Sequence, residues 1–142
     1  MKATTLCLFL VMMGTVMAQA PAKRSSTEAS MQVFWEKFKT AVIKRDKAAV
    51  ANLSQFPIGM PYLQKDIKTR ADLSKRYRAV FNQETDAAKC FSKARPEIDS
   101  TLPKEFYVAC SYPDGGGERP LVYYFTLTRS GWRFFAFDNI NE

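Results

Sequence analysis

The chain has 142 residues, of which 13% are aromatic, and a formal net charge of +7 at pH 7. This length suits one globular domain with a substantial core. The sequence contains no histidine and three cysteines, which removes the usual acid–base side chain near neutral pH and leaves too few ligands for a zinc site. We therefore expect neither a metal nor a cofactor.

Residues 1–20 have the pattern of a secretory signal peptide. Lys2 supplies the positive charge, an apolar run extends from Leu6 to Met17, and Ala18-Gln19-Ala20 forms a small-residue cleavage signal. The apolar run is shorter than the roughly 20 residues that a helix needs to cross a bilayer. The alternative is a buried N-terminal helix. We expect a secreted or periplasmic protein without a membrane span, cleaved after about Ala18 or Ala20.

Export determines how the rest of the sequence is interpreted. We expect a short linker over residues 21–26 and a single domain over residues 27–142. Because Cys7 lies in the cleaved segment, Cys90 and Cys110 are expected to form a disulfide in an oxidising compartment, the alternative being two free buried thiols. A basic exported domain is attracted to anionic surfaces, and nucleic acid is not an expected partner.

Helices are expected in the first half of this domain. The first runs from about Thr27 to Lys44, and the second, from Lys47 to Leu53, is capped by Asp46. Pro57 prevents the helix from continuing, and residues 58–63 are interpreted as an irregular or edge strand. The apolar residues with helical spacing on the first helix are Met31, Phe34, Trp35, Phe38, Ala41 and Val42.

A third helix is expected after its capping residue, Thr69. Its core-facing residues are Leu73, Tyr77, Val80 and Phe81. Residues 82–93 fit either a short helix or a strand. The densest positive charge of the chain lies just before and within this third helix, and it is either an ordinary solvated face or an anion-binding surface. The basic residues are Lys65, Lys68, Arg70, Lys75, Arg76 and Arg78.

The second half of the domain shows the alternation of strands. The pattern predicts strands from Glu105 to Tyr112, from Leu121 to Thr128 and from Trp132 to Asp138. The glycine-rich residues 114–117 are expected to form a turn, and Ser130-Gly131 a two-residue hairpin turn. The register that follows places Leu127 opposite Phe134, Phe125 opposite Ala136, Thr126 opposite Phe135 and Tyr124 opposite Phe137.

Helices followed by an antiparallel meander indicate an α+β fold. Three segments resemble the nuclear-transport-factor-2-like superfamily in its exported bacterial branch of unknown function, namely Phe34–Pro57 with its Arg45-Asp46-Lys47 turn, Ala71–Phe81 and Gly131–Glu142. The resemblance implies N-terminal helices packed on a curved antiparallel sheet, forming a cone with a pocket at its open end. The superfamily includes ketosteroid isomerase, scytalone dehydratase and polyketide cyclases, and several members dimerise through the sheet, so the fold does not decide the function.

Enzymes of this superfamily act through Asp, His and Tyr side chains inside the cone. Asp138, at the end of the last strand, is the candidate base, with Tyr124 or Tyr107 as a hydrogen-bond donor. The alternative is that Asp138 ends its strand by bonding the local backbone. Six aromatic residues form either an apolar ligand pocket or an ordinary core, and these are Trp35, Phe38, Tyr77, Phe81, Tyr124 and Phe137.

The favoured interpretation is an exported, non-enzymatic binding domain for a small apolar or amphipathic ligand or for a partner protein. A homodimer formed through the sheet is one such assembly. The first alternative is an isomerase or lyase of the ketosteroid-isomerase type that uses Asp138 with a tyrosine. The second is an envelope-interaction protein that uses the basic surface between Lys65 and Arg78. A filled cone favours partner binding, whereas a cavity beside Asp138 favours the enzyme.

Overall fold

The computed structural model describes residues 26–61, 65–83, 85–111 and 120–139. The expected signal peptide, nearly all of the expected linker and the glycine-rich turn at residues 114–117 lie outside these ranges. No helix in the described ranges is long and apolar enough to span a membrane.

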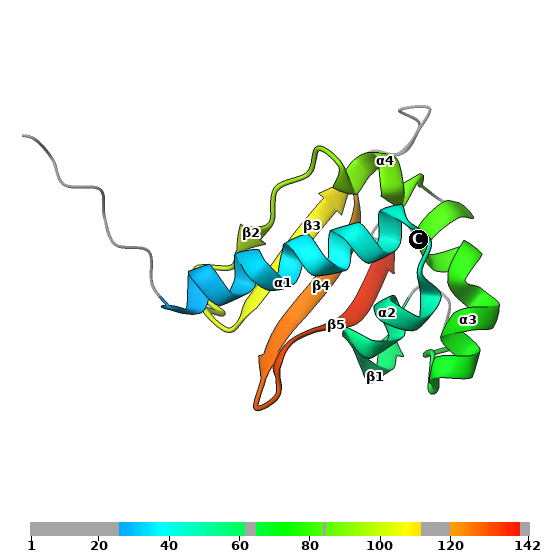
Figure 1. Ribbon diagram of the computed structural model, residues 1–142, viewed down its shortest axis with the longest axis horizontal. Coiled ribbons are helices and arrows are strands. Elements are labelled where there is room, and N and C mark those ends of the chain that lie inside the picture. The colour runs from blue at the N-terminus through cyan, green and yellow to red at the C-terminus, as the bar shows by residue number, and fades with distance from the viewer. Residues whose placement is uncertain (1–25, 62–64, 84, 112–119, 140–142) are drawn as a thin grey trace, which may run out of the picture.

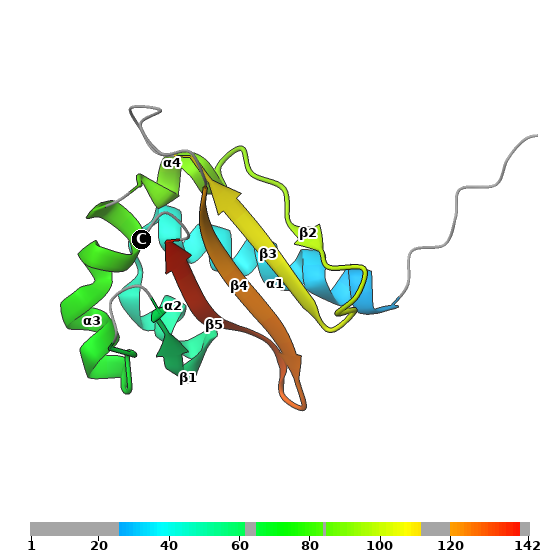
Figure 2. The same ribbon diagram turned by 180° about the vertical axis from the view of Figure 1, so that it is seen from behind.

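Within the described residues, helices cover one face of a five-stranded sheet and none lies on the opposite face, as Figure 1 and Figure 2 show from the two sides. The strand order is β1-β5-β4-β3-β2. This arrangement confirms the expected α+β class with N-terminal helices packed on the sheet. In chain order the elements are α1 (Ser26–Ile43), α2 (Lys47–Asn52), β1 (Ser54–Gly59), α3 (Arg70–Arg78), the π-helix η2 (Ala79–Gln83), α4 (Ala87–Phe91), β2 (Glu97–Ile98), β3 (Glu105–Cys110), β4 (Leu121–Thr128) and β5 (Gly131–Asn139).

Side-chain caps explain where the shorter helices begin. The carboxylate of Asp46 accepts a hydrogen bond from Ala49 N at 2.9 Å, and Thr69 Oγ1 accepts one from Asp72 N at 3.1 Å. Both predicted caps are therefore confirmed, and each satisfies a backbone N–H that the first helical turn leaves without a partner. In the segment left open by the sequence, Asp86 caps α4, so the short helix is the correct alternative.

One edge of the sheet differs from the prediction. The expected strand over residues 58–63 begins earlier, at Ser54, and it pairs with β5 in parallel. Pro57, which follows a cis peptide bond, lies within this strand. An edge strand tolerates proline because it needs its backbone N–H groups on one side only. The other four strands are antiparallel.

The hairpin between β4 and β5 turns one residue earlier than predicted. Thr128 lies opposite Gly131, so the turn residues are Arg129 and Ser130. Gly131 has a φ of 96°, which only glycine adopts readily, and Thr128 Oγ1 donates to Gly131 O at 2.7 Å. All four predicted pairs are therefore wrong. The observed pairs are Leu127 with Trp132, Thr126 with Arg133, Phe125 with Phe134, and Tyr124 with Ala136.

A β-bulge beside Tyr124 and Phe125 then changes which side chains of β5 face the helices. An extra residue in one strand shifts its alternation by one position. Phe134 is buried before the bulge, whereas Phe137 is buried after it. Asp138 therefore lies on the sheet face opposite the helices, which we call the outer face, and not on the face of Phe134 as predicted.

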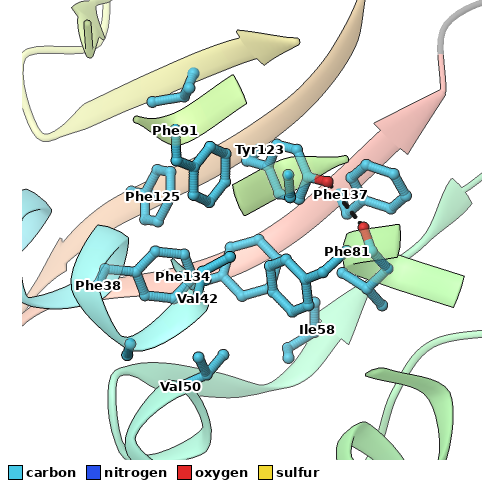
Figure 3. Packing of buried hydrophobic residues seen from close by; sticks show 14 of the residues in the cluster. Phe38, Val42, Val50, Ile58, Phe81, Phe91, Tyr123, Phe125, Phe134 and Phe137 are labelled. Atoms are coloured by element: carbon cyan, nitrogen blue, oxygen red, sulfur yellow. Dashed lines mark hydrogen bonds between the residues drawn. The ribbon is translucent and has the colours of Figure 1, made fainter. Parts of the chain in front are cut away.

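Aromatic rings fill the space between α1 and the sheet (Figure 3). The Phe38 ring is fully buried, and its centroid lies 5.0 Å from that of Phe125 and 5.4 Å from that of Phe134. Tyr123 is also buried among these rings, and its hydroxyl donates a hydrogen bond to Val80 O at 2.8 Å. The core is therefore dense and largely aromatic.

The predicted disulfide between Cys90 and Cys110 is present and joins α4 to β3. The two cysteines are 20 residues apart in the chain. Closing a loop of this size restrains the unfolded state and stabilises the fold by about 3 kcal/mol in the chain-entropy description. A disulfide is compatible with the expected export, since such bonds persist in oxidising compartments.

Candidate functional site

The residues expected around a ligand pocket divide between two places. Trp35, Phe38, Tyr77, Phe81 and Phe137 are each 3% exposed or less and belong to the core. Their rings contact other rings, as in the 5.0 Å between the centroids of Trp35 and Phe91. The structure thus places these five side chains in the packed core, and Tyr77 among them also lines a pocket at the end of α3. Tyr124 lies outside the core.

The candidate base and its two tyrosines all lie on the outer face of the sheet. On β3, β4 and β5, paired residues form rows across this face, and the bulge lies between the row through Thr126 and the row through Tyr124. The three rows across the face are Glu105–Thr126–Arg133, Tyr107–Tyr124–Ala136 and Ala109–Val122–Asp138. Asp138 and Tyr124 are therefore diagonal neighbours, but they do not face the interior of the cone.

Both outer-face tyrosines are stabilised in the protonated form. A hydrogen bond from the Tyr107 hydroxyl to Glu97 Oε2, 2.9 Å long, raises the pKa of Tyr107, and the charge of Glu97 adds to the effect. Partial burial raises the pKa of Tyr124, and the Asp138 carboxylate raises it further. These phenols therefore act as hydrogen-bond donors and not as bases over the ordinary pH range.

The outer face also carries a continuous band of aromatic rings. The centroid of Tyr124 lies 6.3 Å from that of Tyr107 and 6.4 Å from that of Phe135. All three side chains are only partly buried. A flat aromatic band with polar edges suits contact with a protein surface. General acid–base catalysis is favoured instead by a site that excludes water and positions the reacting atoms.

The basic residues between Lys65 and Arg78 do not all lie in one place. Arg76 bonds Lys65 O at 2.8 Å and lies 3.5 Å from Met60 Sδ, on one side of α3. Arg78, two residues later, lines a separate pocket on another side of the helix, as expected for positions two apart on a helix. Arg70 bonds the side-chain oxygen of Asn52. Three of the six predicted cations, Arg70, Arg76 and Arg78, therefore lie in different surroundings.

Arg78 instead lies beside Arg45 and Lys47, two cations outside the predicted basic surface. A pocket of about 370 Å³, which we call the Tyr77 pocket, is lined by Arg45, Lys47, Tyr77, Arg78 and Asn82. The α1–α2 turn supplies Arg45 and the start of α2 supplies Lys47. The end of α3 supplies Tyr77 and Arg78, and η2 supplies Asn82. The only local signal for this grouping was the basic turn at residues 44–47.

An open groove also runs between α1 and α2, with a volume of about 610 Å³. Its apolar floor is formed by Ala41, Ala49 and Leu53, which are buried or half-buried. Charged side chains, including Lys37 and Lys44, stand at its rim. Within the described ranges, no group of three or more His, Cys, Asp or Glu side chains is placed to hold a metal ion.

No protein-family model matches this chain. No curated protein is significantly similar to it. Solved structures that it resembles include an uncharacterised protein with a cystatin-like fold from Caulobacter vibrioides, with 14% identity, 81% of this chain and 89% of that chain covered, and a TM-score of 0.47. Another is a putative dehydratase from the NTF2-like family of Streptomyces avermitilis, with 11% identity, 80% and 96% covered, and a TM-score of 0.45. A third is a putative polyketide cyclase from Sinorhizobium meliloti, with 15% identity, 77% and 96% covered, and a TM-score of 0.46.

These similarities concern the fold. Similarity in fold at such identities says nothing of activity, because function depends on the residues of the site.

Proposed function

We propose that this chain is an exported binding domain that associates through the outer face of its sheet, and that the partner is a second copy of the chain. The observation that carries the proposal is the position of the aromatic band of Tyr107, Tyr124 and Phe135. This band lies on the outer face, which no helix of the described residues covers (Figure 2). The core rings fill the space under the helices, so recognition is assigned to a surface and not to the interior.

The charges on this face favour a second copy as the partner. Glu105 and Arg133 stand at opposite ends of one row, with Thr126 between them. A two-fold axis running along β4 would bring Glu105 of each copy opposite Arg133 of the other, and Tyr124 opposite its own equivalent. Such an interface is isologous, so every favourable contact is made twice.

The export part of the proposal has separate support. It rests on the signal-like pattern of residues 1–20 and is compatible with the Cys90–Cys110 disulfide. N-terminal sequencing of the protein purified from its own host tests it. A chain that begins at Met1 would overturn it, whereas cleavage after Ala18 or Ala20 supports it.

A small amphipathic ligand is the second candidate, and the groove between α1 and α2 favours it. The groove combines the apolar floor of Ala41, Ala49 and Leu53 with charged rim residues, which suits a molecule with both characters. Native mass spectrometry of the host-purified protein reports both candidates at once. A doubled mass supports the sheet-mediated dimer, and a co-purifying small molecule supports the ligand.

Charge-swap variants test the geometry of the dimer. Glu105→Arg and Arg133→Glu each place like charges opposite one another, so we expect each single variant to be monomeric in analytical ultracentrifugation. The double variant restores opposite charges and is expected to dimerise again. Val33→Glu is the matched control because Val33 is 58% exposed on α1, away from the sheet face, and this variant should remain dimeric. A monomeric wild-type protein, or single variants that remain dimeric, would refute the proposal.

A further inference from the structure

Tyr77, which lines the Tyr77 pocket, has a buried hydroxyl group without a partner among the described residues. Tyr77 is only 3% exposed, and its ring packs 4.7 Å from that of Phe81, centroid to centroid. Among the described residues no atom forms a hydrogen bond with its hydroxyl oxygen. Proteins rarely leave a buried polar group unpaired, because the lost hydration is not replaced. The hydroxyl therefore lacks a partner that a ligand in the pocket can supply.

The Tyr77 hydroxyl also remains protonated over the ordinary pH range, so it is a hydrogen-bond donor. Burial raises the pKa of Tyr77 to about 12, an effect that Arg45 partly opposes and Asp46 increases. A protonated phenol offers its hydrogen to an acceptor oxygen. The missing partner is therefore expected to be a hydrogen-bond acceptor.

Arg45, which lines the pocket, has an unfavourable backbone conformation. It has a φ of 55°, in the left-handed region that non-glycine residues seldom adopt. Its N–H bonds Val42 O at 3.0 Å, and Asp46 N bonds Ala41 O at 2.9 Å. This pair of bonds is the helix-ending Schellman motif, in which glycine usually occupies the position of Arg45. The chain thus carries an arginine where the backbone geometry favours glycine.

The cations of the pocket are not neutralised by ion pairs. In the described parts of the chain, no ion pair involves Arg45, Lys47 or Arg78. Lys47 Nζ bonds Ser74 O at 3.2 Å and lies 5.6 Å from the centroid of the Tyr77 ring. The nearby carboxylate, Asp46, caps α2. The local charge is therefore strongly positive.

We propose that the Tyr77 pocket binds a phosphate group. Three cations against the carboxylate of Asp46 leave a charge that a phosphate dianion balances. Arginine guanidinium groups match phosphate oxygens in pairs, and the Tyr77 hydroxyl and the Asn82 amide supply neutral donors. The pocket volume of about 370 Å³ leaves space for the organic part of a phosphate ester. This site is distinct from the outer face of the sheet, so it does not depend on the proposed dimer.

Calorimetric titration of the folded, oxidised protein tests the proposal with defined probes. The probes are inorganic phosphate, glycerol 3-phosphate, and vesicles of phosphatidylcholine with and without phosphatidylglycerol. We expect saturable binding to at least one phosphate-bearing probe at low ionic strength. Stronger binding of glycerol 3-phosphate than of inorganic phosphate indicates a soluble ester. Binding only to the phosphatidylglycerol vesicles indicates a lipid headgroup.

Two variants locate the binding in the pocket. Tyr77→Phe removes one hydrogen bond to a charged group, and we expect binding to weaken about tenfold or more. Arg45→Gly removes a cation and relieves the left-handed backbone, so binding should weaken by at least as much while the melting temperature does not fall.

The matched control is Arg129→Gly, which makes the same charge change in the exposed turn between β4 and β5. It should bind each probe as the wild-type protein does. The proposal is overturned if no probe binds saturably, if Arg129→Gly weakens binding as much as Arg45→Gly, or if Tyr77→Phe leaves binding unchanged. The sedimentation of all three variants should match that of the wild-type protein, so failure here is separable from failure of the dimer.

Discussion

Replacing Tyr77 with phenylalanine should stabilise the ligand-free protein. The ring contacts with Phe81 are kept, whereas the buried hydroxyl that has no described partner is removed. Leaving a buried hydroxyl unpaired costs about 1–3 kcal/mol. We therefore expect the free energy of unfolding near neutral pH to rise by about 1–2 kcal/mol, which for a domain of this size raises the melting temperature by about 4 °C or more.

The same substitution should also remove a loss of stability at alkaline pH. The pKa of Tyr77 is about 12 in the folded protein, against 10.0 for the free side chain. When folding raises the pKa of a group, its contribution to the free energy of unfolding is fully present below the pKa of the unfolded state. That contribution is lost as the pH rises to the pKa of the folded state. For Tyr77 the loss falls between pH 10 and 12 and totals about 3 kcal/mol.

Urea unfolding followed by circular dichroism, from about pH 7 to about pH 11, measures both effects. The difference in unfolding free energy between Tyr77→Phe and the wild-type protein should be positive at neutral pH and should widen above pH 10. At neutral pH, Tyr107→Phe is the control, because the Tyr107 hydroxyl already has a hydrogen-bond partner in Glu97, so this variant should not stabilise the protein as Tyr77→Phe does. A Tyr77→Phe protein that is less stable than the wild type, or that shows the same alkaline loss, would refute the reasoning.

Three further substitutions test the core, the disulfide and a cap by urea unfolding. Phe38→Ala empties a fully buried site among aromatic rings, so it should cost about 3–5 kcal/mol, and a loss below about 1 kcal/mol would contradict the packed core. Replacing both Cys90 and Cys110 with serine should cost about 3 kcal/mol, and an unchanged midpoint would argue against the bridge. Thr69→Ala removes the cap of α3 and should cost about 1 kcal/mol. For this last variant, unchanged stability would show that the cap contributes nothing.

Features that depend on near neighbours in the chain were predictable. Asp46 and Thr69 were identified as caps because a capping side chain bonds a backbone N–H only a few residues away. The extent of β4, Leu121–Thr128, was predicted to the residue from its alternation. The pairing of Cys90 with Cys110 was predicted because an exported domain with two cysteines is expected to form one disulfide, and the bond is present.

The candidate sites were less predictable, because they depend on how distant segments meet. Asp138 was expected to share a face with Phe134, and the bulge in the β4–β5 pairing places it on the outer face instead. Alternation along one strand cannot indicate a bulge, since the extra residue is accommodated by packing on both faces of the sheet. The same bulge takes Phe137 into the core.

By itself, the sequence determined the caps, the strand and helix spacing, the α+β class and the disulfide, since each rests on short-range periodicity, local hydrogen bonds or cysteine count. Only the tertiary structure decided that β1 joins β5 in parallel and that Arg45 and Arg78 meet beside the hydroxyl of Tyr77. Arg45 and Tyr77 lie far apart in the chain, and no local pattern links them. They come together because the turn after α1 and the end of α3 pack at the same end of the core.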